Sequence, residues 1–398
     1  MGVGTIYNPF LILIRLIKYL YIIFFLIVSF SNVVSASENN NQLKIGLLVP
    51  FSGELKDVGK SIMLSLHLAL REIDNKDITV VPRDSGTNDK KKLNLAITEL
   101  KNQGVKIVIG PIERSSHEEL KRHQSMIFIS PSNISSEVES NIISFGINLE
   151  SQLKSITNFL DKNKKTKTVI MFPDDEYAQY IEDKLLEMNI KSFKIFKYNT
   201  DPKLITSDIE KLTNYSQRKR NLENRKKVLE DKEDEESIKE LEILEQKYTL
   251  GKVNYDSFII IDFGNSLKSV LTSLIFVDVN QNEVLFLTAN QWFDRSIFLE
   301  NSVKKIFYPS INFKSYKKYK NNYLKTFGVE PFEISILTYD ALGLIYYIWE
   351  KNKKINTVKD FLIKNKIKGK LGRFNFENSK LYHDLEIYRA EDNKFSKM

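Results

Sequence analysis

The chain has 398 residues, of which 42% are hydrophobic and 28% are charged, proportions that exclude a disordered chain, a collagen-like fibre and a multi-spanning membrane protein. It contains no cysteine, so we expect no disulfide, no thiolate metal site, no cysteine nucleophile and no lipid-modified cysteine anchor. The net charge of +8 is spread along the chain. Because no basic cluster with interleaved aromatic residues stands out, we expect no nucleic-acid partner.

Residues 1–36 have the pattern of a secretory signal peptide. Arg15 and Lys18 precede an uncharged apolar run from Tyr19 to Phe30, and Val34-Ser35-Ala36 supplies the small residues that signal peptidase requires. We expect export, cleavage after Ala36 and a periplasmic location. The alternative is an uncleaved anchor, which would hold Arg15 and Lys18 inside the membrane at a cost of a few kcal/mol each. No later apolar run approaches the length of a membrane span.

From Leu43 onward, apolar strands alternate with amphipathic helices. The first series of expected strands covers residues 43–49, 78–81, 105–109 and 126–129. Helices follow the first two strands, one carrying the stripe Ile62, Leu66, Ala69 and Ile73, and one that Gly104 ends. This alternation predicts right-handed crossovers and a doubly wound parallel sheet.

A second series begins after Asn148. Its expected strands cover residues 168–172, 193–197, 258–262 and 284–287, with a helix at 177–188, two long helices at 313–327 and 334–349, and a closing hairpin made by 374–376 and 385–388. The fold class predicted is α/β, with two doubly wound parallel-sheet lobes. Lobe 1 would hold residues 43–148 and 310–366, and lobe 2 would hold 149–309 and 367–398.

The stretch from Lys203 to Leu250 interrupts the alternation. It has no proline or glycine, and residues 216–247 are dense in charged side chains. Narrow apolar stripes predict two amphipathic helices that turn near Asp231 to Glu235. We expect a charged helical hairpin inserted in lobe 2; its role is either a solvated structural element or an arm that binds a partner.

Three motifs together resemble the type I periplasmic-binding-protein fold, the fold of branched-chain amino-acid binding proteins. They are Ile45-Gly46-Leu47-Leu48-Val49-Pro50-Phe51-Ser52-Gly53 followed by Gly59, Gly104-Val105-Lys106-Ile107-Val108-Ile109-Gly110-Pro111, and Thr338-Tyr339-Asp340-Ala341-Leu342. Their order and spacing extend the resemblance over about Leu43 to Tyr388.

The chain also resembles one branch of that fold more closely, the penicillin-binding-protein activators with an LppC/LpoA-like C-terminal domain. The features are Asp84-Ser85-Gly86-Thr87, the charged insert with Tyr215-Ser216-Gln217-Arg218 and Arg225, and Ala289-Asn290-Gln291-Trp292. The resemblance implies a partner, a peptidoglycan synthase of the penicillin-binding-protein class. The absence of a cysteine departs from the lipoprotein members of the branch, so their anchoring is not carried over.

Ligands of open parallel sheets bind at the carboxyl ends of the strands, and the loops there are rich in hydroxyl and amide side chains. The candidate cleft residues are Ser52, Ser85, Thr87, Ser115, Ser116, Ser132, Tyr177, Asp262 and Trp292. The resemblance to amino-acid binders implies that Ser115 and Ser116 hold a ligand carboxylate and that Asp262 holds its ammonium. The alternative is that these residues cap helices and close turns; likewise, Arg114 beside Glu113 would form a local pair.

The sequence favours a non-enzymatic protein. No zinc-protease, nucleophile-elbow or phosphate-loop motif is present, and the four histidines are scattered singly, so we expect no catalytic residue, no metal and no cofactor. Two hypotheses remain: a regulator of peptidoglycan synthesis that acts by protein–protein contact, and a binding protein that delivers an amino acid or similar solute to an ABC permease. Tyr177 is followed by Ala178, where amino-acid binders usually carry glycine, and Trp292 is large enough to fill the cleft. We therefore expect no tight closure on a free amino acid.

Overall fold

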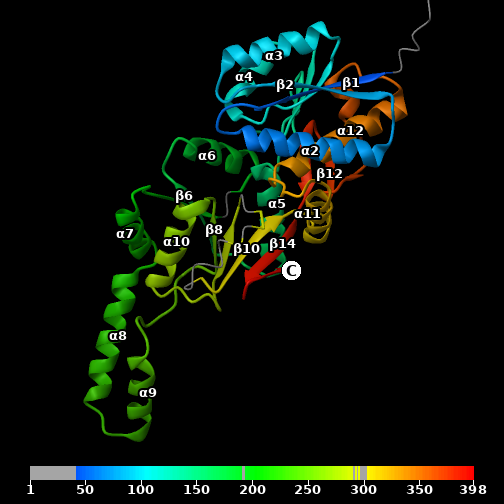
Figure 1. The fold of residues 1–398 in the computed structure, drawn as a ribbon. Helices are drawn as coiled ribbons and strands as arrows, with labels where there is room; N and C mark the ends of the chain where they lie inside the picture. Colours follow the sequence, from blue (N-terminus) through cyan, green and yellow to red (C-terminus); the bar gives the residue numbers. More distant parts are fainter. Residues whose placement is uncertain (1–41, 191–192, 290–291, 294, 296–302) are drawn as a thin grey trace, which may run out of the picture. The chain divides into compact units, whose positions relative to one another are not determined.

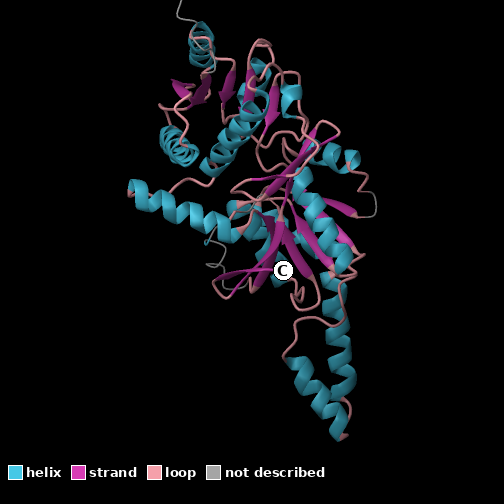
Figure 2. Ribbon diagram, turned by 90° about the vertical axis from the view of Figure 1, so that its right-hand side faces the viewer, coloured by secondary structure: helices cyan, strands magenta, loops and turns pink. Residues whose placement is uncertain are grey.

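A computed structural model of the chain describes residues 42–190, 193–289, 292, 293, 295 and 303–398. The predicted signal peptide, residues 1–36, lies outside the described residues. The chain divides into residues 1–43 and one compact unit of residues 44–398, and this unit contains two large sheets flanked by helices (Figures 1 and 2). Among the described residues, no helix combines the length and the apolarity needed to cross a bilayer.

The first sheet has five strands in the order β2-β1-β3-β4-β5. They are β1 (Leu43–Val49), β2 (Ile78–Asp84), β3 (Ile107–Ile109), β4 (Ile127–Ser130) and β5 (Ile142–Ser144). β1 pairs with β3, β3 with β4 and β4 with β5, all in parallel. Nearly continuous apolar runs suit these strands because helices cover both faces of such a sheet. The sequence patterns located the first four strands but missed β5.

Helices close both faces of this sheet. They are α2 (Lys56–Ile73), α3 (Lys90–Asn102), α4 (His117–Leu120), α11 (Phe313–Phe327) and α12 (Ser335–Asn352), with 3₁₀ turns at Arg114–Ser116 and Val358–Phe361. On one face, α3 buries Leu93, Ile97 and Leu100 against strand residues such as Phe128. α2 and α12 pack along one another, and α11 joins them where Tyr319 donates a 2.9 Å hydrogen bond to Ser65.

Two of the motif glycines are explained by close backbone approaches. A Cβ at Gly59 would lie 1.8 Å from the carbonyl oxygen of Pro50, and a Cβ at Gly110 would lie 1.9 Å from that of Leu48. Gly110 also has a φ of +106°, which side chains other than glycine rarely adopt. These contacts hold the β1 and β3 ends close to the start of α2.

The second sheet has seven strands in the order β15-β14-β10-β9-β8-β6-β7. The parallel strands are β6 (Thr168–Pro173), β7 (Lys194–Tyr198), β8 (Ser257–Ile260), β9 (Leu285–Thr288) and β10 (Lys305–Ser310), and the antiparallel edge is β14 (Glu386–Glu391) and β15 (Lys394–Lys397). Helices α5 (Leu149–Lys162) and α6 (Ala178–Glu187) bury leucine and isoleucine side chains against one face. Helices α7 (Pro202–Leu212) and α10 (Gly264–Phe276) pack against each other, and α7 contacts β7.

The predicted closing hairpin was wrong in its pairing. β12 (Arg373–Glu377) pairs with β13 (Lys380–Asp384) and with β11 (Ile367–Lys368) in a third, antiparallel sheet, while β14 joins the second sheet beside β10. The turn between β12 and β13 is Asn378-Ser379, with φ values of +51° and +57°. Two adjacent residues with positive φ favour a tight two-residue hairpin turn, and this signal was not recognised in the sequence.

The predicted helical hairpin is present. It consists of α8 (Tyr215–Glu230) and α9 (Glu235–Glu245), which extend away from the second sheet beyond α7 (Figure 1). Leu222, Leu229 and Leu244 form its small apolar cluster. Across the two helices, Arg225 makes two hydrogen bonds to Glu240, of 2.8 and 2.6 Å. The boundaries of the two lobes stay a prediction.

Candidate functional site

Ser52, Ser85 and Thr87 come together where β1 and β2 end. The Nζ of Lys92 lies 2.6 Å from Asp84 and donates a 2.8 Å hydrogen bond to the Oγ of Ser52. Thr87 donates to the carbonyl oxygen of Ser52 at 3.2 Å, and the buried Ser85 donates to that of Gly86 at 3.1 Å. Ser85 and Thr87 therefore donate to neighbouring loop carbonyls, as turn-closing residues do, and the Ser52 hydroxyl accepts from Lys92 at the start of α3.

Asp84 organises this pair of loops. Its Oδ1 accepts hydrogen bonds from the backbone N–H groups of Phe51 (2.8 Å) and Gly86 (2.9 Å). Burial by itself raises the pKa of Asp84, but hydrogen bonds from Lys92 and from these backbone groups outweigh it and hold the pKa well below its usual range. Asp84 is therefore a charged structural anchor for the loops.

The candidates after β3 and β4 are divided between surface and interior. Ser115 is exposed and donates a 3.0 Å hydrogen bond to Asn88, whose backbone N–H donates to Glu113 at 2.7 Å. Ser116 and Ser132 are buried, at 7% and 8% exposure. The backbone N–H of Ser132 donates to Ser130 at 3.2 Å, which closes the turn after β4.

In the second sheet, Asp262 follows β8 and is 7% exposed. Tyr198 donates a 2.5 Å hydrogen bond to its Oδ2, and the backbone N–H of Phe263 donates to its Oδ1 at 2.7 Å. Burial, followed by the charge of Asp262, raises the pKa of Tyr198, so the hydroxyl stays protonated as a donor. Asp262 thus already has two donors from its own sheet.

The Tyr177 ring contacts a loop of the first sheet. The guanidinium of Arg114 lies 5.1 Å from the ring centre of Tyr177 and 4.9 Å from that of Tyr180, within the range of cation–π attraction. Among the described contacts, Arg114 makes these two ring interactions and no ion pair with Glu113. The local pair considered for Arg114 is therefore replaced by a contact between the loop after β3 and helix α6.

A cavity of about 240 Å³ lies beside Trp292, between residues of both sheets. Only Ser132 and Trp292 of the nine candidates line it. The other lining residues were not among the nine candidates, although the first four belong to the strand-end loops that carried them: they are Ile112, Arg114, Pro131, Asn133, Ile147, Gln152, Pro309, Ile334 and Leu337. Most are apolar residues in loops or at helix starts, and no local sequence signal distinguishes them from core residues.

The described lining of this cavity carries a positive charge and no negative charge. Among the described residues of its lining, Arg114 is the single ionisable one, and none is an aspartate or glutamate. An apolar wall with one cation suits a carboxylate on an apolar body. A zwitterion would lose the hydration of its ammonium group without an opposing carboxylate, and a buried unpaired charge is costly.

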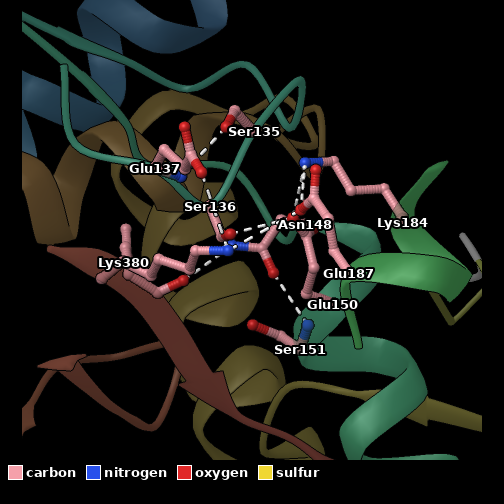
Figure 3. A network of polar contacts seen from close by, with 10 residues as sticks. Ser135, Ser136, Glu137, Asn148, Glu150, Ser151, Lys184, Glu187 and Lys380 are labelled. Carbon is pink, nitrogen blue, oxygen red and sulfur yellow. Dashed lines mark hydrogen bonds and ion pairs between the residues drawn. The ribbon is translucent and has the colours of Figure 1, made fainter. Parts of the chain in front are cut away.

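A buried polar network connects the segment after β4 with helices α5 and α6 (Figure 3). Glu150 at the start of α5 is 1% exposed, and Ser136 donates a 2.8 Å hydrogen bond to its Oε1. The Nζ of Lys184 on α6, 8% exposed, lies 3.3 Å from the same oxygen and 3.1 Å from Glu187. Burial lowers the pKa of Lys184, but Glu150 and Glu187 outweigh it, so the pKa is raised and the ammonium stays charged.

The third sheet is attached to the same network. The backbone N–H of Leu381 donates to the carbonyl oxygen of Ser136 at 2.7 Å, and Asn148 donates its side-chain amide to the carbonyl oxygen of Leu381 at 2.8 Å. The Nζ of Lys380 lies 3.7 Å from both Glu137 and Glu187 (Figure 3). These contacts join first-sheet, second-sheet and β13 residues in one hydrogen-bonded assembly.

No group of three or more histidine, aspartate or glutamate side chains with the arrangement of a metal site occurs in the described part of the chain. The polar clusters that are present serve loops and element junctions. Their partners in the described structure are backbone groups, hydroxyls and ion-pair neighbours.

The parallel strands of the two large sheets have the orders β2-β1-β3-β4-β5 and β7-β6-β8-β9-β10. Helices cover the faces of both sheets, and a cavity lies between their loops. This arrangement is the type I periplasmic-binding-protein fold. Residues 42–189 match the family model described as periplasmic binding protein. The search of curated proteins found no match to the sequence.

Solved structures with this fold include both kinds of protein considered from the sequence. The LpoA C-domain from Haemophilus influenzae, described as a regulator of PBP1A, is 14% identical with a TM-score of 0.60, over 89% of this chain and 99% of that one. A branched-chain amino-acid ABC transporter periplasmic ligand-binding protein from Burkholderia xenovorans is 11% identical with a TM-score of 0.64, over 90% and 94%. An extracellular ligand-binding receptor from Desulfohalobium retbaense is 13% identical with a TM-score of 0.53, and the chain spans 59% of its length and aligns over 90% of its own. These proteins are binding proteins or regulators, and identities this low show the fold alone.

Proposed function

We propose that this protein is an exported, non-enzymatic regulator of peptidoglycan synthesis, which acts by direct contact with a peptidoglycan synthase of the penicillin-binding-protein class. The observation that carries the proposal is the composition of the cavity beside Trp292. Its described lining offers Arg114 for an anion and no carboxylate for an ammonium group. A free amino acid would therefore bind poorly, and amino-acid delivery loses its main requirement.

The contacts between the sheets support the same proposal. A solute-binding protein must open and close its cleft, a motion that needs low-cost contacts between the moving parts. Here Ser136, in the segment after β4, donates a hydrogen bond to the buried Glu150 of α5, and Arg114 lies against the rings of Tyr177 and Tyr180. Separating the sheets would remove this donor from a buried carboxylate and the rings from Arg114, so the arrangement favours a fixed surface that presents itself to a partner. The likeness to the LpoA C-domain is consistent with such a role.

The test combines a ligand panel with a partner assay. Purified protein lacking residues 1–36 is melted with each proteinogenic amino acid. A ligand at 100 times its dissociation constant would stabilise the protein by about 2.7 kcal/mol, or roughly 3–4 °C for a unit of this size. In parallel, binding to a purified bifunctional peptidoglycan synthase is titrated by surface plasmon resonance. A flat panel with saturable synthase binding supports the proposal; a clear rise in melting temperature with a free amino acid overturns it.

Solute binding for an ABC importer is the second candidate, and Arg114 within an apolar lining favours it for one ligand class. The panel therefore includes aliphatic and aromatic monocarboxylates that lack an ammonium group. If one of them raises the melting temperature, and Arg114→Gln removes the rise but Arg122→Gln does not, the solute-binding role is supported. Arg122 is the matched control because it is exposed and absent from the cavity lining.

A further inference from the structure

A groove of about 740 Å³ lies on helix α12, lined by residues of α2, α11, α12 and the segment 367–370. It shares no lining residue with the cavity beside Trp292. Four aromatic side chains line it: Tyr347 is 45% exposed, and Tyr319, Tyr339 and Phe374 are buried. Its volume falls within the range of about 300–1,000 Å³ that is typical of ligand sites.

The floor of the groove contains a glycine in the middle of a helix. Gly343 is exposed in the 18-residue helix α12, and no atom lies within 4 Å of a Cβ built on it. Glycine is among the least favourable residues in a helix interior, and no close packing requires it here. Because Gly343 has no side chain, the space above the groove floor between Tyr339 and Tyr347 stays open.

The wall opposite α11 is held in place by a buried carboxylate. Asp340 accepts hydrogen bonds from the backbone N–H groups of Lys370 and Leu371, each at 2.7 Å. Gly369 is pressed against it, since a Cβ there would lie 2.2 Å from its Oδ2. The segment 367–370 is thus fixed to α12, and the groove is formed before any partner binds.

The groove has a positive rim. Lys318, Lys368 and Lys370 line it, together with Glu72 and Asp340. Glu72 lies 2.7 Å from Lys370, so these two charges offset each other. Lys318 and Lys368 have no ion-pair partner within the described part of the chain. Helix α11 carries five lysines and no acidic residue, which adds to the positive potential along one side.

We propose that this groove docks an acidic peptide segment of a partner protein. Carboxylates of the segment would pair with Lys318 and Lys368, and an aromatic or aliphatic side chain would lie over Gly343 against the tyrosine rings. An acidic peptide fits better than a polyanion without apolar groups, because only a peptide covers the ring surface and meets the lysines together. This docking does not depend on the proposed role in peptidoglycan synthesis, since a solute-binding protein would present the same groove.

The experiment measures fluorescence anisotropy with a labelled peptide, Asp-Glu-Trp-Asp-Leu-Glu, and its uncharged counterpart, Asn-Gln-Trp-Asn-Leu-Gln. The acidic peptide should bind with saturation and weaken as salt is added, and the amide peptide should bind at least about tenfold more weakly. No saturable binding of the acidic peptide overturns the proposal.

Matched variants locate the site. Lys318→Glu with Lys368→Glu should weaken binding by about tenfold or more, because two exposed ion pairs are lost and reversed. Lys317→Glu with Lys364→Glu changes the net charge equally at exposed positions outside the lining and should have a smaller effect. Equal losses in both pairs would mean attraction by overall charge and would overturn the groove site.

A third variant tests the floor without changing charge. Gly343→Trp fills the space above α12 and should abolish peptide binding, whereas Gly343→Ala should retain it; circular dichroism confirms that both fold. Unchanged binding by Gly343→Trp contradicts the proposal. A deoxythymidine oligomer serves as a polyanion probe: if it binds as tightly and is lost with the same variants, the groove is a polyanion site and the peptide proposal is wrong.

Discussion

Replacing Lys184 by methionine should destabilise the protein far more than the loss of an ordinary lysine. The change leaves Glu150, 1% exposed, with its hydrogen bond from Ser136 and without its cation. Its second oxygen, Oε2, accepts no hydrogen bond in the described structure. Removing one partner of a buried ion pair costs about 3–5 kcal/mol. We expect the free energy of unfolding to fall by about 3 kcal/mol, since Glu150 and Glu187 would both lose the ammonium group that lies between them.

The loss is measured by urea unfolding at pH 7, followed by circular dichroism, with the m-value checked for constancy. The double variant Glu150→Gln with Lys184→Met removes both charges, and its neutral amide still accepts from Ser136, so it should recover most of the stability. The control is Lys60→Met, which removes a 58%-exposed lysine from a surface pair with Asp57 and should change stability by less than about 1 kcal/mol.

Two results would refute this reasoning. If Lys184→Met lowers the free energy of unfolding by less than about 1 kcal/mol, water or a rearranged side chain compensates Glu150, and the ion pair does not hold α5 and α6 together. If the double variant is as unstable as the single one, the packing of the Lys184 stem matters and its charge does not.

Three further predictions concern other parts of the fold. Arg218 is 5% exposed and donates hydrogen bonds to the carbonyl oxygens of Thr213 and Val277, at 3.1 and 2.5 Å. Arg218→Met should destabilise the base of the α8–α9 hairpin by about 3 kcal/mol, measured as faster hydrogen exchange across residues 215–245. Arg220 is exposed, and Arg220→Met should leave the exchange unchanged. Gly343→Ala should raise the free energy of unfolding by roughly 0.5–1 kcal/mol; a lower stability in urea unfolding would contradict an open floor at this position. Burial lowers the pKa of His383 to about 4, so its stabilising effect is complete above about pH 6.5 and is lost as the pH falls toward 4; His383→Phe should flatten this part of the stability–pH curve, and an unchanged slope would count against it.

Local patterns in the sequence located most of the parallel strands, helices α2, α3, α6, α11 and α12, and the insert, but gave no prediction for β10, β11, β15, α4, α5 or α10. The apolar run of β1, the stripe of α2 and the paired stripes of α8 and α9 each bury a face that can be recognised from neighbouring residues. The same patterns indicated doubly wound parallel sheets, because the alternation of strand and helix restricts the crossovers, and the motif resemblance pointed to the type I binding-protein fold. β5 was missed because three residues give no period, and β13 because the turn Asn378-Ser379 was not recognised.

The chemistry of the sites was decided by tertiary contacts. The hydroxyls of Ser52, Ser85 and Thr87 have partners in neighbouring loops and in α3, and whether a serine faces a ligand or a neighbouring element depends on residues far away in the sequence. The lining of the groove on α12 joins Glu72 to Lys370, 298 positions apart. Such contacts follow no periodicity, because they arise where separate elements are packed into one core; the sequence specifies each element, and only their packing brings the charges together.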